Sequence, residues 1–79
     1  MNAYPNPARD RMMITYPADL MNATLEVLDA QGRSVRLTSL SAHTGFVELD
    51  VHAWADGLYL ARVLANGDVI GETKCTIAR

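Results

Sequence analysis

The sequence predicts an all-β fold, an Ig-like antiparallel sandwich of about seven short strands. Three observations support this prediction. Apolar and polar residues alternate in short runs, and turn residues separate these runs about every 8–12 positions. The pair Asn66-Gly67, a strong hairpin signal, lies between the last two runs.

The bulk composition indicates one small folded domain. The chain has 79 residues, 49% of them hydrophobic, and a net charge of −2. A domain of this size buries only about 60% of the surface of its unfolded chain, so we expect marginal stability. The hydrophobic content excludes a disordered tail, the scattered basic residues give no footprint for nucleic acid, and no apolar stretch approaches the roughly 20 residues of a membrane span.

The N-terminal segment contains two prolines in Tyr4-Pro5-Asn6-Pro7. Proline fixes its own φ, lacks an amide N–H, and biases the preceding residue toward extended conformations. We therefore expect a stiff, extended arm that joins a sheet only at an edge. The first clear strand follows at Met12–Tyr16 and is closed by Pro17.

The segment from Asp19 to Gly32 admits two interpretations. A helix can be drawn with Asp19 as N-cap and Gly32 just past its end. The alternative is a hairpin of strands 24–29 and 34–37, in which the inward residues are Leu25, Val27, Val35 and Leu37. Periodicity alone leaves the two near even, and the β character of the other segments favours strands.

Three further strands follow. Phe46–Val51 alternates cleanly, with Val47, Leu49 and Val51 on one face. Gly57–Leu64 is the strongest strand candidate, and the return strand after Asn66-Gly67 covers Val69–Ala78. This last strand is expected to turn four side chains inward: Val69, Thr73, Cys75 and Ile77.

An outward apolar row is predicted on the strand 57–64. If Tyr59, Ala61 and Val63 face the core, period-2 geometry turns Leu58, Leu60 and Leu64 outward. Such a row on a small domain usually marks an interaction site, here for a receptor or for a weak homodimer. The alternative is that the loop Ser39–Gly45 folds over these leucines.

No catalytic constellation is found in the sequence. His43 and His52 have no cysteine or carboxylate arranged to complete a metal site, and no cofactor motif is present. Cys75 is expected to be a small buried hydrophobe rather than a reactive thiol. Trp54 is expected to close one end of the sandwich. We therefore predict a domain that is not an enzyme and needs no cofactor.

Several motifs, in order, resemble those of a known family. They are Tyr4-Pro5-Asn6-Pro7, the run Leu25–Arg33 with its Asp29-Ala30-Gln31-Gly32, the run Asp56–Val63, and the final Thr73–Arg79. Together they resemble the C-terminal sorting domain of cargo proteins of the type IX (Por) secretion system. Cys75 departs from the family pattern, in which a bulkier residue is more usual.

The resemblance implies an Ig-like sandwich that acts as an address on exported Bacteroidetes proteins and catalyses nothing. Its expected partners are an N-terminal cargo domain, the outer-membrane translocation machinery, and a sortase-like peptidase that cuts upstream of the domain. The cargo would reach the cell surface or the medium through the periplasm. The resemblance also favours strands over a helix in the segment from Asp19 to Gly32, with Gly32 as a hairpin glycine.

On this reading residues 1–79 form one sorting domain, and residues 1–10 lead in from the cargo linker. The double proline would mark the junction between the cargo linker and the sorting domain. The candidate sorting and recognition residues are Pro5, Asn6, Pro7, Gly32, Gly57, Leu58, Tyr59, Leu60, Leu64, Lys74, Ile77 and Arg79. The alternative function is a plain Ig-like spacer or a carbohydrate-binding module of a surface adhesin.

Overall fold

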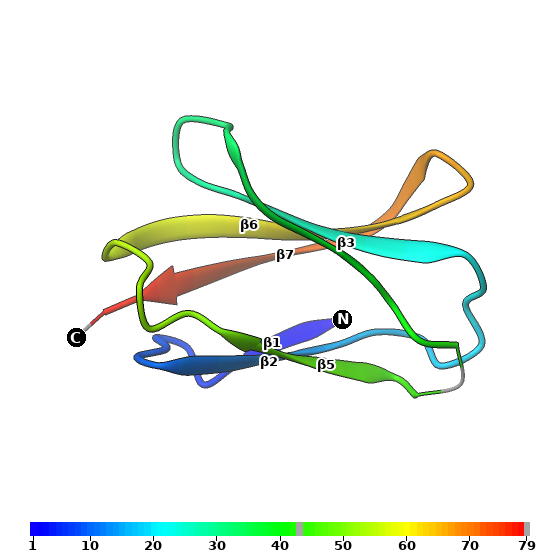
Figure 1. Cartoon of the computed structure of the whole chain (residues 1–79), viewed down its shortest axis with the longest axis horizontal. Helices are drawn as coiled ribbons and strands as arrows, with labels where there is room; N and C mark the ends of the chain where they lie inside the picture. Colours follow the sequence, from blue (N-terminus) through cyan, green and yellow to red (C-terminus); the bar gives the residue numbers. More distant parts are fainter. Residues whose placement is uncertain (43, 79) are drawn as a thin grey trace.

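The computed structural model describes residues 1–42 and 44–78, and within them seven strands and no helix form a two-layer sandwich (Figure 1). The described residues therefore include no helix that could cross a membrane. The strands are β1 (Asn2–Tyr4), β2 (Arg11–Thr15), β3 (Ala23–Leu28), β4 (Ser34–Ser39), β5 (Phe46–Asp50), β6 (Gly57–Ala65) and β7 (Asp68–Ile77). The predicted all-β sandwich is confirmed, and the helix drawn from Asp19 is not formed.

The strand order is close to that of an immunoglobulin domain. One sheet has the order β1-β2-β5 and the other β4-β3-β6-β7, and neighbouring strands are antiparallel. An immunoglobulin constant domain places its first, second, fifth and fourth strands in one sheet and its third, sixth and seventh in the other. Here the fourth strand pairs with the third instead.

The core lies between the two sheets and follows the period-2 pattern of the strands. Residues on the inner faces of β2, β3, β5, β6 and β7 are almost fully buried. The buried hydrophobic residues are Ala8, Met12, Ile14, Tyr16, Ala23, Leu25, Val27, Leu49, Val51, Tyr59, Ala61, Val63, Cys75 and Ile77. The predicted inward positions on β3, β5 and β6 are thus confirmed, except that Val47 is only half-buried.

The predicted inward positions on β4 were wrong. Val35 is 41% exposed and Leu37 is 65% exposed. Leu37 pairs with Glu26 on the outer face, and a bulge between Val27 and Leu28 leaves Val35 as the extra residue of β4. A bulge shifts the register and so changes which side chains face the core.

A second bulge explains why Val69, predicted to face inward, is 46% exposed. Val63 pairs with Gly71 but Leu64 pairs with Val69, so Ile70 is the extra residue of β7. Since Leu64 faces outward, Val69 faces outward beside it. Beyond the bulge the prediction holds: Cys75 and Ile77 are buried and Thr73 is half-buried.

The N-terminal segment is not the extended arm that the two prolines predicted. β1 is an edge strand, as expected, but it ends at Tyr4. Pro5 and Pro7 lie in the connection from β1 to β2, and both follow cis peptide bonds. Because β1 and β2 are antiparallel neighbours, the chain turns back between Tyr4 and Arg11 instead of running straight through the double proline.

Candidate recognition site

Four segments that overlap the family-like motifs meet at one end of the sandwich. These are residues 5–10, 29–33, 51–57 and 74–78, and we name this region the motif end (Figure 1). Ile77 pairs with Gly57 on one side and forms a parallel bridge with Ala8 on the other. The amide of Val51 donates to the carbonyl of Asp10 at 2.8 Å, so the segments 5–10 and 51–57 are also joined.

The double-proline segment is hydrogen-bonded along the edge of β7. The amide of Ala8 donates to the carbonyl of Thr76 at 2.8 Å, and the amide of Ala78 donates to the carbonyl of Ala8 at 2.9 Å. The side-chain Oδ1 of Asn6 accepts the amide of Thr76 at 3.1 Å. Ala8 itself is fully buried. The last residues of β7 are consequently not an open sheet edge to which another strand could be added.

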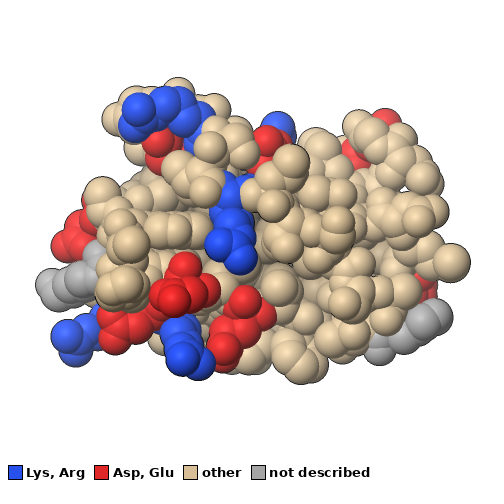
Figure 2. Space-filling model, in the orientation of Figure 1, with Lys and Arg blue, Asp and Glu red and all other residues tan. Residues whose placement is uncertain are grey.

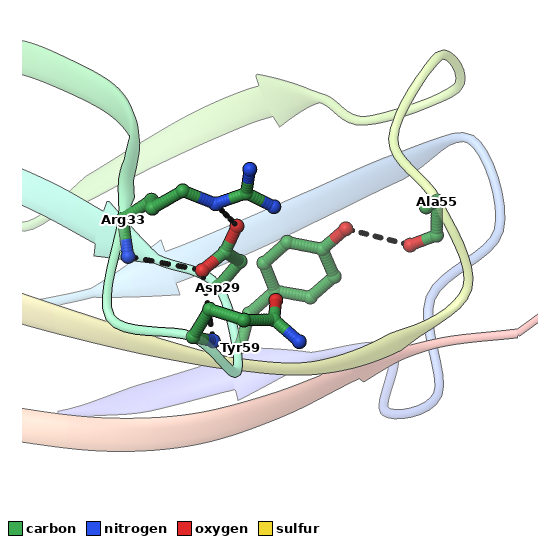
Figure 3. A network of polar contacts seen from close by, with 5 residues as sticks. Asp29, Arg33, Ala55 and Tyr59 are labelled. Carbon is green, nitrogen blue, oxygen red and sulfur yellow. Dashed lines mark hydrogen bonds and ion pairs between the residues drawn. The ribbon is translucent and has the colours of Figure 1, made fainter.

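The turn from β3 to β4 is held by one carboxylate (Figure 3). Oδ1 of Asp29 accepts the amides of Gln31 and Arg33 at 3.0 and 2.9 Å, and Oδ2 pairs with Nε of Arg33 at 2.9 Å. The backbone N–H of Arg33 is the main reason that the pKa of Asp29 is lowered from its ordinary value. Gly32 has a φ of +84°, as predicted for a hairpin glycine.

Tyr59 anchors the loop that leads into β6. Its ring is buried and its hydroxyl donates to the carbonyl of Ala55 at 2.6 Å (Figure 3). The ring of Trp54 lies 5.3 Å from it, centre to centre. A tyrosine at the start of the sixth strand that bonds a carbonyl a few residues upstream is the tyrosine corner of Ig-like sandwiches. Trp54 is half-buried against the core, as expected.

The outward direction of the leucine row on β6 is confirmed. Leu58 is 49% exposed and Leu60 and Leu64 are half-buried, whereas Tyr59, Ala61 and Val63 are buried. The described part of the segment 39–45 does not fold over the row. Leu40 packs against the core and its amide donates to the carbonyl of Ala23, and at the other end of the segment the carbonyl of Gly45 accepts from Tyr16 beside the opposite sheet.

An ion pair divides this outer leucine row. Nη2 of Arg62 lies 2.6 Å from Oε1 of Glu26, which is its direct neighbour across β3 and β6. The hydrogen bond from Arg62 lowers the pKa of Glu26. Leu58 and Leu60 remain on the side toward the motif end, whereas Leu64 lies on the far side next to Val69.

Two adjoining hollows lie where the turn 29–33 approaches β6. The first measures about 200 Å³ and the second about 180 Å³. The first is lined by Asp29, Ala30, Leu58, Tyr59, Leu60 and Lys74. Figure 2 shows charged side chains gathered at the end of the molecule where this turn lies, and a mostly uncharged surface at the opposite end.

The remaining candidate recognition residues lie in a connection, at the start of a strand or in the core. Pro5 and Pro7 flank the Asn6 contact, Gly57 lies at the start of β6 with a φ of +148°, and Ile77 is a core residue. Arg79 and His43 lie outside the described residues. Sequence reasoning missed Ala8, because a single small residue after a proline carries no periodic signal that would mark it as buried.

Among the described residues, no group of His, Cys, Asp or Glu side chains could hold a metal ion. Cys75 is fully buried, and burial raises the pKa of its thiol. Tyr16 is also buried and donates its hydroxyl to the carbonyl of Ser41 at 3.0 Å, whereas Tyr4 and Phe46 are each 50% exposed.

Comparison with known proteins identifies the family of this fold. Neither a curated protein nor a solved structure matches the chain. A family model described as a secretion system C-terminal sorting domain matches residues 2–77, which include all four segments of the motif end up to Ile77. The chain therefore belongs to the family of secretion system C-terminal sorting domains, the type IX signals that mark proteins for export to the cell surface or the extracellular space.

Proposed function

We propose that this domain is a non-catalytic export signal. The secretion machinery would recognise it as a folded unit, and a sortase-like peptidase would then remove it from its cargo. A domain of this family is attached to a cargo domain and interacts with the type IX secretion machinery. The cut would fall upstream of residue 1, in the linker to the cargo. The sandwich would thus be recognised during export and would not remain on the mature protein.

The observation that supports this proposal is the hydrogen-bonded junction of the two ends of the domain. Asn6 and Ala8, close to the N-terminus, bond to Thr76 and Ala78, close to the C-terminus. A chain that is still unfolded or is truncated at either end lacks this junction. Recognition of the motif end would therefore select complete, folded domains.

We place the recognition surface on the outer face of the sheet β4-β3-β6-β7. Leu58, Leu60 and Lys74 lie beside the motif end, and none of the three outward leucines is a core residue. Addition of a receptor strand at the end of β7 is a weaker alternative, because Asn6 and Ala8 already occupy the hydrogen-bonding groups of Thr76.

A reporter fusion tests the export function. The 79 residues are placed behind a signal peptide and a fluorescent protein in a bacterium with type IX secretion, and surface or medium fluorescence is compared with periplasmic fluorescence. Delivery to the surface or medium is the expected result. Periplasmic retention of the intact fusion would contradict the proposal and favour the spacer or carbohydrate-binding alternative.

The same fusion tests the leucine face and the peptidase step. Leu60→Ser with Leu64→Ser should shift the unfolding midpoint only modestly, since both side chains are half-buried, but should impair export. A loss on the scale of core truncations, about 2–5 kcal/mol, would instead assign the leucines to the core.

The peptidase step is tested on the exported reporter by mass spectrometry. The reporter should have a new C-terminus upstream of residue 1, and this C-terminus should be absent in a strain that lacks the peptidase.

A further inference from the structure

The part of the leucine face next to Lys74 has the form of a small groove. We name the hollow of about 200 Å³ between the turn 29–33 and β6 the Lys74 groove. Leu58 and Leu60 supply apolar walls from β6, and Ala30 supplies one from the turn. The turn is fixed by the three hydrogen bonds that Asp29 accepts, so the opposite wall is held in place before any partner binds.

The charge of the groove is unbalanced. Asp29 lines it but is already paired with Nε of Arg33 at 2.9 Å. Lys74, directly opposite Leu60 in the register of β6 and β7, forms no ion pair with any described residue. An apolar hollow of this size beside one uncompensated ammonium group would accept an apolar side chain and a neighbouring carboxylate.

We propose that the Lys74 groove binds a segment of a partner protein in which a large apolar side chain adjoins an Asp or Glu residue. This inference rests on the proposed export function and names the chemistry by which the secretion machinery would recognise the domain. The apolar side chain would lie between Leu58 and Ala30, and the carboxylate would meet Lys74. One lysine gives only short-range charge selection, which suits a peptide side chain and not a polyanion.

The other part of the leucine row provides a matched control. Leu64 lies on the same strand and the same face, but the ion pair of Glu26 with Arg62 separates it from the groove. Its register neighbour on β7 is Val69 and not a cation. A substitution at Leu64 therefore changes the apolar area of the face without touching the groove.

Binding is measured by titrating the isotope-labelled domain with two short peptides and following amide resonances. The probes are acetyl-Phe-Asp-amide and acetyl-Phe-Lys-amide. We expect saturable shifts at Leu58, Leu60 and Lys74 with the acidic peptide and about threefold weaker binding of the basic one, the discrimination that one exposed charge pair supplies. Lys74→Glu should reverse this preference, whereas Lys74→Arg should retain it.

Export of the reporter fusion gives the second measurement. Lys74→Glu and Leu58→Ser should reduce delivery in proportion to their loss of binding, whereas Lys74→Arg should be delivered like the unaltered domain. The Leu64→Ser control removes apolar area outside the groove, so it should be delivered clearly better than Leu58→Ser. Unfolding midpoints of all four variants are measured, and Lys74→Gln replaces Lys74→Glu if the latter does not fold.

The failures of the two proposals are distinguishable. If the unaltered fusion stays in the periplasm, the export function itself is wrong. If the unaltered fusion is exported but the folded Lys74 variants are exported equally well, or if neither peptide gives saturable shifts in the groove, the groove proposal is overturned and the export function stands.

Discussion

The side chain of Asn6 and the backbone of Thr76, seventy positions apart, are joined by a hydrogen bond of 3.1 Å. This contact ties the connection after β1 to the last residues of β7. It lies next to the bridge of Ala8 with Ile77, so a side chain and a backbone segment together cover the end of β7. Asn6 thus has a structural role at the end of β7.

Replacing Asn6 with Ala removes the only side-chain acceptor that the described structure gives the Thr76 amide. We expect the free energy of unfolding to fall by about 1 kcal/mol, the usual net value of one hydrogen bond. The matched control is Asn6→Asp, which keeps an acceptor oxygen and should stay closer to the original. Urea denaturation measures both. Equal losses in the two variants would show that the acceptor is not what Asn6 contributes.

The last strand is expected to be indispensable to the fold. Ile77 is 1% exposed, and truncating it to Ala should cost about 2–5 kcal/mol, a large share of the stability of so small a domain. Val69 on the same strand is 46% exposed, so Val69→Ala should change stability by less than about 0.5 kcal/mol. Urea denaturation of both variants measures this difference.

Removal of residues 73–79 extends the same argument to the whole strand. It deletes the buried Cys75 and Ile77 together with the Thr76 partner of Asn6 and Ala8. Cooperative unfolding and export of the reporter fusion should both disappear. A truncated fusion that is exported normally would contradict the requirement for a folded domain.

The sequence was sufficient for the fold where the pattern was regular. Val27, Leu49 and Ala61 lie on strands whose alternation is unbroken, and each was placed inward correctly. Val35 and Val69 were misplaced because each lies at or next to a bulge. A bulge depends on how two strands pair, so alternation within one strand cannot reveal it.

The candidate site was predicted only in its components. Gly32 and Tyr59 were recognised as a turn residue and an inward residue, but the approach of the turn 29–33 to β6, which forms the Lys74 groove, comes from the pairing of β3 with β6. The covering of β7 by Asn6 and Ala8 could not be predicted either. It depends on the chain turning back at the double proline, whereas local preferences suggested an extended arm.

Acid should destabilise the domain through Asp29. Hydrogen bonds from Arg33 and Gln31 lower the pKa of Asp29 in the folded state, so the stability that they provide is present in full above the ordinary pKa of about 4. That stability is lost as the pH falls below this value through the lowered folded pKa. Asp29→Asn should therefore lose less stability than the original domain between pH 6 and pH 3, measured by urea denaturation. Equal losses would contradict this role of Asp29.

The turn from β6 to β7 should tolerate asparagine but not valine at its glycine. Asn66 and Gly67 have φ values of +54° and +86°, the two positive values of a type I′ hairpin turn, as the sequence predicted for Gly67. A Cβ added at Gly67 would have no neighbour within 4 Å, so the cost of a substitution comes from the backbone alone. Gly67→Val should therefore lower the free energy of unfolding by about 1–3 kcal/mol, because a β-branched residue is strained at positive φ. Gly67→Asn should lose clearly less, because asparagine adopts this conformation readily. Urea denaturation compares the two, and equal losses would mean that crowding and not φ sets the requirement for glycine.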